Sequence, residues 1–193
     1  MKDQVTSILC SGTGGQGVIL ASDIMAEVFF DAGYDVKKSD VHGMAQRGGS
    51  VISHVRFGKK VHSPVIKQGD ADILFAFELL EGLRCLNFMK PGGKVVINDL
   101  RINPPVVNLG EMEYPKEVEK TIGDKFSDFY LVKATELAEK AGDMKATNVV
   151  MLGALSKLLE MDEEIWVKNI LIHLPPRVHD LNRKAFQMGR EVV

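Results

Sequence analysis

The chain has 193 residues, of which 45% are hydrophobic, and its 24 basic and 26 acidic residues give a formal net charge of −2. This is an ordinary globular composition, and we expect residues 1–193 to form a single domain. The charge balance excludes the basic excess that is typical of nucleic-acid-binding proteins. No stretch approaches the roughly 20 apolar residues that span a bilayer, and the N-terminus lacks a signal-like apolar core. We therefore expect a cytoplasmic protein that does not contact membranes.

The chain has only two cysteines, which limits the metal centres that it could hold. Cys10 and Cys85 lie far apart and form no C-x-x-C pattern, which suits a reducing compartment. An iron–sulfur cluster usually takes about four thiolates. We therefore expect no cluster in this chain, and the scattered histidines predict no metal site either.

The N-terminal pattern is that of a βαβ unit. A short apolar run at residues 5–10 leads into a glycine cluster at 11–17, and helical periodicity follows from Val18 to Ala32. Gly33 ends this helix, and a second strand begins at 34–36.

The rest of the chain alternates between strands and helices. Residues 51–57 and 61–66, on either side of Gly58, predict an antiparallel hairpin. Strands are predicted at 72–77, 95–98 and 129–132, the first two of them buried, with an exposed connection at 101–114. Helices are predicted at 79–89, 116–125, 135–141, 148–159, 163–171 and 177–189. This alternation predicts one Rossmann-like α/β domain, with a mostly parallel sheet, helices on both faces and an antiparallel hairpin.

The glycine cluster matches G-x-G-x-x-G through Gly12, Gly14 and Gly17, directly between a strand and a helix. Such glycines bring backbone N–H groups and a helix N-terminus close to an anion such as a phosphate. An NTPase loop is disfavoured, because Val18 and Ile19 stand where Lys and Ser or Thr are required. The glycines could also serve only to pack the strand tightly against the helix.

A dinucleotide site would need an acidic residue about 20 positions further on, at the end of the second strand. Asp35 and Asp40 are both near that distance, but Lys37 and Lys38 make this strand polar and leave neither aspartate securely placed. Dinucleotide binding therefore stays open as an alternative.

The polar segment 39–50 concentrates His42, Gln46, Arg47 and three glycines where a plain amphipathic helix usually begins. Arg47 can donate two charge-assisted hydrogen bonds to a phosphate or carboxylate. Loops at the carboxyl ends of strands meet ligands in such sheets. We expect this segment and the glycine cluster to face the same crevice. Arg47 and His42 could instead form internal hydrogen bonds that brace the loop, and for His42 alone this structural role is the better interpretation.

These motifs together resemble the gamma-type subunit of 2-oxoacid:ferredoxin oxidoreductases. The resemblance rests on residues 12–18 (GTGGQGV), 41–49 (VHGMAQRGG), 63–66 (SPVI), 70–74 (DADIL), 90–93 (KPGG) and 182–186 (NRKAF). The second motif is most similar to the beta subunit of indolepyruvate oxidoreductase, which is the homologue of gamma in that branch.

The resemblance implies a complex that converts a 2-oxoacid and coenzyme A to an acyl-CoA and carbon dioxide and reduces ferredoxin. It implies that thiamine diphosphate, Mg²⁺ and iron–sulfur clusters lie on larger partner subunits, and that this chain is inactive alone. We expect indolepyruvate or another aryl pyruvate as the substrate, and no catalytic residue here. The candidate residues for coenzyme A or for a partner loop are Gly12, Gly14, Gly15, Gln16, Gly17, His42, Gln46, Arg47, Gly48 and Gly49. The alternatives are a free-standing dinucleotide-binding oxidoreductase and a non-catalytic adaptor.

Overall fold

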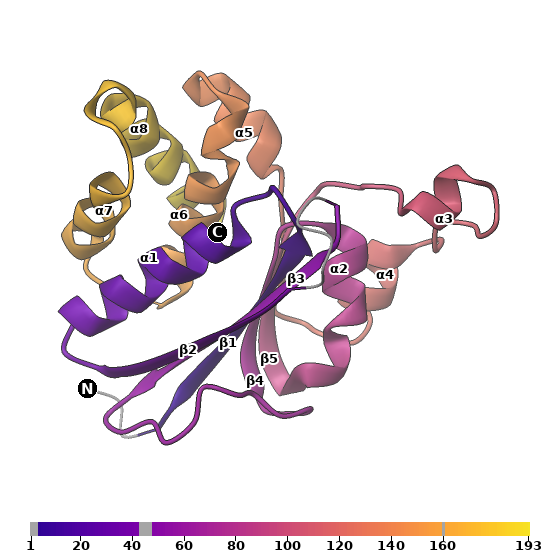
Figure 1. The fold of residues 1–193 in the computed structure, drawn as a ribbon, viewed down its shortest axis with the longest axis horizontal. Coiled ribbons are helices and arrows are strands. Elements are labelled where there is room, and N and C mark those ends of the chain that lie inside the picture. The colour runs from indigo at the N-terminus through magenta and orange to yellow at the C-terminus, as the bar shows by residue number, and fades with distance from the viewer. Residues whose placement is uncertain (1–3, 43–47, 160) are drawn as a thin grey trace.

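The protein is built on a six-stranded sheet with helices on both faces (Figure 1). The computed structural model describes residues 4–42, 48–159 and 161–193. The strand order is β2-β3-β1-β4-β5-β6, and β3 is antiparallel to both of its neighbours while β1, β4, β5 and β6 are parallel. The strands are β1 Thr6–Thr13, β2 Asp35–His42, β3 Ser50–Gly58, β4 Ala71–Ala76, β5 Met89–Asn98 and β6 Phe129–Val132.

The central strands are apolar on both faces because helices cover both. In β1, Ile8 and Cys10 lie in one core cluster, whereas Leu9 lies in the other. Alternate residues of a strand point to opposite faces. A continuous apolar run is therefore what a strand covered on both sides requires.

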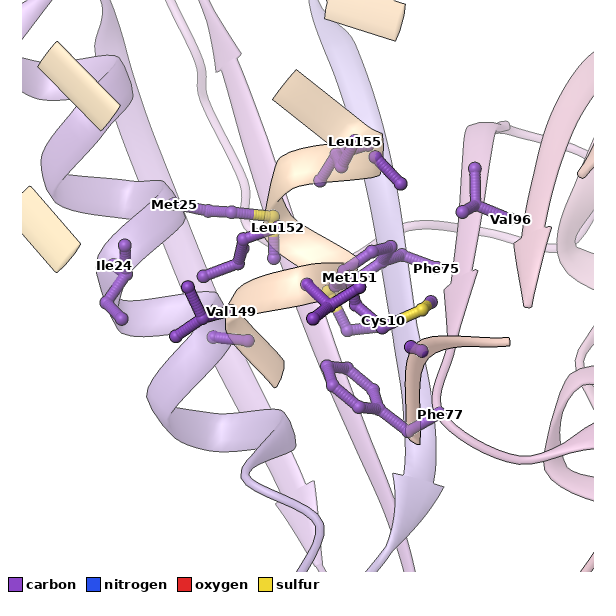
Figure 2. Close-up of a cluster of buried hydrophobic side chains, with 14 of the residues drawn as sticks. Cys10, Ile24, Met25, Phe75, Phe77, Val96, Val149, Met151, Leu152 and Leu155 are labelled. Carbon is purple, nitrogen blue, oxygen red and sulfur yellow. The ribbon is translucent and has the colours of Figure 1, made fainter. Parts of the chain in front are cut away.

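Five helices form the layer on the first face: α1 Val18–Asp31, α5 Ala134–Ala141, α6 Thr147–Leu159, α7 Glu163–Ile172 and α8 His179–Arg190. Helix α6 is the innermost. Figure 2 shows Leu152 beside Met25 of α1, and Met151 beside Phe75 of the sheet. Every residue from 148 to 156 is buried, as expected for a helix packed on all sides.

The second face carries the shorter helices α2 Leu79–Arg84 and α4 Val118–Gly123. A single turn, α3 Pro105–Asn108, stands away from the rest of the molecule in Figure 1. Short 3₁₀ turns at Leu86–Phe88, Met144–Ala146 and Pro176–Val178 complete the chain.

The predicted fold class is confirmed, but the predicted hairpin was wrong in its second arm. Residues 61–66 form no strand, and β3 pairs with β2 instead. Because β1 and β2 occupy both edges of β3, residues 61–66 have no edge left to pair with. They are held by side chains instead: the Ile66 N–H donates to Nδ1 of His54 (3.2 Å), and the Val61 N–H donates to Asp35 (2.9 Å).

Candidate functional site

The candidate site lies where β1, β4 and β5 end, at the carboxyl edge of the parallel strands. We call this region the glycine-turn edge and define it as residues 12–17, 48–49, Phe77, Asn98, Thr135 and Lys145. Ligands of open α/β sheets bind beyond the carboxyl ends of the strands. The edge is therefore the part of the fold at which binding is expected.

Two glycine-rich elements meet here. The Gly14 N–H donates to the Gly49 carbonyl (2.8 Å), and the Gly48 N–H donates to the Gly14 carbonyl (3.3 Å). The antiparallel pairing of β1 with β3, which sets Thr13 opposite Ser50, brings them together. The turn at 12–17 and the end of the polar segment thus form one surface.

Gln16 braces the turn from within. Its Oε1 accepts from the Thr13 N–H (2.7 Å), and its Nε2 donates to the Phe77 carbonyl (3.2 Å). Asn98 also donates to this carbonyl (3.2 Å), and its Oδ1 accepts from the N–H of Ala134 at the start of α5 (3.1 Å). Gln16 and Asn98 thereby tie the ends of three strands and one helix together.

Gly12 and Gly17 meet different steric demands. A Cβ at Gly12 would lie 2.7 Å from Oε1 of Gln16 and 2.8 Å from Cγ2 of Val18, so only glycine lets the Gln16 side chain fold back. Gly17 is the N-cap of α1 and has φ 79°, a left-handed conformation that glycine adopts readily.

The turn leaves few amides for a ligand. The N–H groups of Thr13, Gly14 and Gln16 are bonded within the protein. Among the described residues, those of Gly15 and Gly17 have no acceptor, and the first turn of α1 has neither a side-chain cap nor an acidic residue. An anion here would meet the free end of a helix, where its charge is favoured.

Two hollows adjoin the glycine-turn edge. One, of about 200 Å³, is lined by Gly15, Gln16, Phe77, Asn98, Leu100, Thr135, Met144, Lys145 and Thr147. The second, of about 320 Å³, lies between the start of α6, α1 and α8 and includes Lys145, Arg177 and Asn182. Lys145 lines both, and among the described residues no carboxylate forms an ion pair with Lys145 or Arg177. Asp143 also lines the second hollow, so the positive charge near the glycine turn comes from Lys145 in both hollows and from Arg177 in the second.

Asp35 and Asp40, the two candidates for binding a dinucleotide ribose, instead accept hydrogen bonds from other groups of the protein. Asp35 begins β2, about 20 Å along the strand from the glycine-turn edge. Hydrogen bonds from the Val61 N–H and Lys37 lower the pKa of its carboxyl group. Asp40 accepts from Ser53 (2.6 Å) and Lys38 (2.7 Å), and β3 separates its strand from β1.

The two cysteines lie in separate cores. Cys10 belongs to the cluster beneath α1 and α6, and Cys85 to the cluster beneath α2. Burial raises the pKa of Cys10 well above its ordinary range and that of Cys85 to about 11. Both side chains are therefore neutral thiols packed as apolar groups.

The described residues provide neither a metal-binding cluster nor a membrane-spanning helix. Residues 4–42, 48–159 and 161–193 contain no group of three or more His, Cys, Asp or Glu side chains placed to hold a metal ion. Within the same residues, no helix has the length and apolar character needed to cross a membrane.

The predicted site residues fall into two sets. The structure places Gly12, Gly14, Gly15, Gln16 and Gly17 at the same edge of the sheet as Gly48 and Gly49. His42 ends β2 opposite Val51. Gln46 and Arg47 lie outside the described residues, and so does the side chain of His42.

Sequence reasoning missed Asn98, Thr135 and Lys145. Asn98 could have been predicted from the sequence, because a polar residue directly after the buried run 95–97 marks the carboxyl end of a strand, where ligands bind. Thr135 and Lys145 could not have been predicted from local sequence, because only the packing of α5 and of the turn before α6 brings them to this edge.

The fold and the glycine-turn edge define a Rossmann-like α/β domain in which the β1–α1 turn faces a hollow. The chain belongs to the pyruvate ferredoxin/flavodoxin oxidoreductase family, whose model matches residues 7–192. It is 40% identical over 191 residues to the indolepyruvate oxidoreductase subunit IorB of Thermococcus kodakarensis, covering 95% of this chain and 93% of that one. The 2-oxoglutarate synthase subunit KorC of Methanothermobacter marburgensis is 26% identical over 194 residues, covering 96% and 95%. The expected family is therefore confirmed.

Solved structures agree. The gamma subunit of a keto/oxoacid ferredoxin oxidoreductase from Geobacter sulfurreducens superposes with a TM-score of 0.72 at 28% identity, covering 96% of each chain. A 2-oxoglutarate:ferredoxin oxidoreductase from Magnetococcus marinus, determined with 2-oxoglutarate, coenzyme A and succinyl-CoA bound, gives a TM-score of 0.76 at 22% identity. The match covers 99% of this chain but 31% of that one, so the same fold occurs there within a longer polypeptide.

Proposed function

We propose that this chain is the small subunit of a cytoplasmic 2-oxoacid:ferredoxin oxidoreductase that acts on indolepyruvate or another aryl pyruvate. The complex would convert the 2-oxoacid and coenzyme A to an acyl-CoA and carbon dioxide, with ferredoxin as the electron acceptor. The 40% identity to an indolepyruvate oxidoreductase subunit over nearly the whole chain carries this proposal.

The reaction's cofactors would lie on larger partner subunits. Thiamine diphosphate with Mg²⁺ supplies the decarboxylation chemistry and iron–sulfur clusters supply the electron path, so this chain alone would be inactive. Its residues do not fit a cluster, because the two thiols are neutral, buried and in separate cores. Its own part would be to complete a binding surface and to assemble with the partners.

The glycine-turn edge would be that binding surface. Coenzyme A carries phosphate groups, and the edge offers the N-terminus of α1 with Lys145 and Arg177 in the adjoining hollows. Arg47 precedes Gly48 in sequence, and Gly48 is bonded to Gly14. We propose that these groups hold coenzyme A phosphates, or a partner loop next to them.

Steady-state kinetics of the assembled complex test the ligand. Arg47→Ala and Lys145→Ala should each raise the apparent KM for coenzyme A, by roughly fivefold or more for a lost charged hydrogen bond, while the KM for the 2-oxoacid stays unchanged. Lys157→Ala, at the far end of α6, is the matched control. An unchanged coenzyme A dependence in an intact complex would exclude binding of coenzyme A by these groups, and contact with a partner loop would remain as their proposed role.

Substrate choice is tested with the same complex. Ferredoxin reduction should be fastest with indolepyruvate or another aryl pyruvate, and slower with 2-oxoglutarate or pyruvate. A preference for 2-oxoglutarate would instead group the enzyme with the KorC relatives.

A further inference from the structure

An arm of the chain projects from the second face of the sheet. We define the α3 arm as residues 101–113, which link β5 to α4 through the single turn α3 (Figure 1). None of these residues, all of which the structure describes, is buried. The arm therefore contributes nothing to either core.

The arm is nevertheless well organised. Pro104 and Pro105 begin α3, and Gly110 ends it with φ 75°. The Gly110 N–H donates to the Val107 carbonyl (3.0 Å) and the Glu111 N–H to the Val106 carbonyl (3.0 Å). This pair of bonds is the Schellman motif, a regular way of ending a helix. The exposed turn is thus shaped before anything binds it.

One buried carboxylate fixes both ends of the arm. Oε1 of Glu78, a residue that is 1% exposed, accepts from the Ile102 N–H at one end (3.1 Å) and from the Tyr114 hydroxyl at the other (3.1 Å). Arg101 lies over the Tyr114 ring, 5.7 Å from its centre, and pairs with Glu119. The base of the arm is therefore rigid, although its tip has no support from the core.

The arm presents apolar side chains to solvent, the most exposed of them at its tip. Leu109 is 72% exposed and Met112 64%, with Ile102 at 39% and Val106 at 38%. Single exposed apolar residues are common, but four within eleven positions on a preformed projection indicate a surface that is covered in the working protein. Pre-organisation lowers the ordering cost of such binding.

The charge of the arm favours a different subunit over a second copy of this chain as its binding partner. Arg101 at the base of the arm pairs with Glu119, and the other charged residues of the arm are Glu111 and Glu113. Glu113 pairs with Lys116 (3.7 Å), whereas Glu111 forms no ion pair with any described residue. A symmetric contact between two copies through the tip would bring their two unpaired Glu111 side chains together, which costs free energy. In the Magnetococcus protein the same fold is part of a longer polypeptide, and relatives of this chain are named as subunits, so a different polypeptide is the expected partner.

We propose that the α3 arm inserts Leu109 and Met112 into an apolar pocket of the larger oxidoreductase subunit, and that basic side chains rim this pocket. The proposal rests on the proposed function, since it needs that subunit to exist. Glu78 is then a positioning residue that presents the arm. The glycine-turn edge stays available for a separate ligand.

Co-purification tests the arm. The tagged wild-type chain is produced anaerobically with its larger subunit, and the recovered ratio of the two chains is measured beside that of Leu109→Asp and Glu111→Lys. Leu109→Asp should lower recovery of the larger subunit roughly tenfold or more, as for a central interface residue. Glu111→Lys should weaken it in a salt-dependent way. Phe30→Asp, which replaces a side chain 71% exposed on α1, is the matched control and should change nothing.

The outcomes separate the two proposals. Because Leu109 is exposed, Leu109→Asp should unfold at the wild-type temperature, so lost recovery would reflect binding. Full recovery with Leu109→Asp would overturn the arm proposal while the proposed function stands. Loss of self-association of the small chain, in place of lost recovery, would identify a second copy as the occupant and also overturn it. No larger subunit with the wild-type chain would overturn both.

Discussion

The Gly14 N–H donates to the Gly49 carbonyl at 2.8 Å, and this bond joins two glycine-rich elements that lie 35 residues apart in sequence. The pairing exists because β3 turns back along β1, so that the start of β3 lies at the end of β1. The antiparallel strand β3 thus brings the end of the polar segment to the β1–α1 turn.

Gln16 should stabilise the free chain before any ligand binds. Gln16→Ala removes the acceptor for the Thr13 N–H and one donor to the Phe77 carbonyl. We expect the free energy of unfolding to fall by about 1–2 kcal/mol, measured by urea denaturation. Gln16→Glu keeps the acceptor for Thr13 but sets a carboxylate oxygen against the Phe77 carbonyl, so it should not restore the lost stability. An unchanged midpoint for Gln16→Ala would mean that this side chain does not brace the turn.

The contact between α6 and α8 should not tolerate a methyl group. A Cβ at Gly153 would lie 2.1 Å from the Phe186 carbonyl oxygen, and one at Gly189 would lie 1.9 Å from that of Val150. We expect Gly153→Ala to cost about 3 kcal/mol of stability through forced separation of the helices. Gly123→Ala, whose Cβ would meet only Phe129 at 3.6 Å, is the control. It should be neutral or raise stability by up to about 1 kcal/mol in thermal unfolding.

His54 should make stability depend on pH. Its buried ring accepts from the Ile66 N–H at Nδ1 (3.2 Å), and burial lowers its pKa, although Asp40 opposes this shift. The unfolded chain then binds a proton more readily than the folded one. The contribution of His54 is therefore complete above the ordinary histidine pKa of about 6.5 and is lost as the pH falls toward the lower folded value.

Thermal unfolding of wild type and His54→Asn between about pH 7.5 and pH 5 measures this effect. Asparagine keeps an acceptor but does not titrate, so the difference between the two melting temperatures should shrink as the pH falls. A difference that stays constant would show that His54 is not the titrating group.

Glu78 should control the rigidity of the α3 arm. Glu78→Ala removes the acceptor shared by the Ile102 N–H and the Tyr114 hydroxyl. We expect amide exchange at Ile102 to accelerate roughly tenfold, the equivalent of one lost buried hydrogen bond. Tyr114→Phe keeps the bond to Ile102 and should leave this amide nearly as protected. Equal protection of the Ile102 amide in all three proteins would contradict the role of Glu78 in holding the arm.

Elements with strong local patterns were predictable from the sequence. Helix α1 begins at Val18, as predicted, because helical spacing directly follows the glycine turn. Strand β6 occupies residues 129–132, as predicted, because an apolar run directly follows a polar loop. Residues 61–66 misled the prediction because an apolar pattern alone does not reveal whether a strand edge is free.

The candidate site was predictable only in part. The glycines are local signals, and they do lie together. The inward fold of Gln16 depends on Phe77, which lies 61 positions away, and the positive hollow depends on where the turn before α6 packs. Such contacts are set by tertiary packing, and no local spacing encodes them.

The most direct test of the central claim is to purify the tagged chain anaerobically from its native host and to identify what is bound to it. We predict a larger subunit that carries thiamine diphosphate and iron–sulfur clusters, and a complex that reduces ferredoxin with an aryl pyruvate and coenzyme A. A lone chain with bound NAD or FAD would contradict this account and restore the free-standing dinucleotide-binding enzyme.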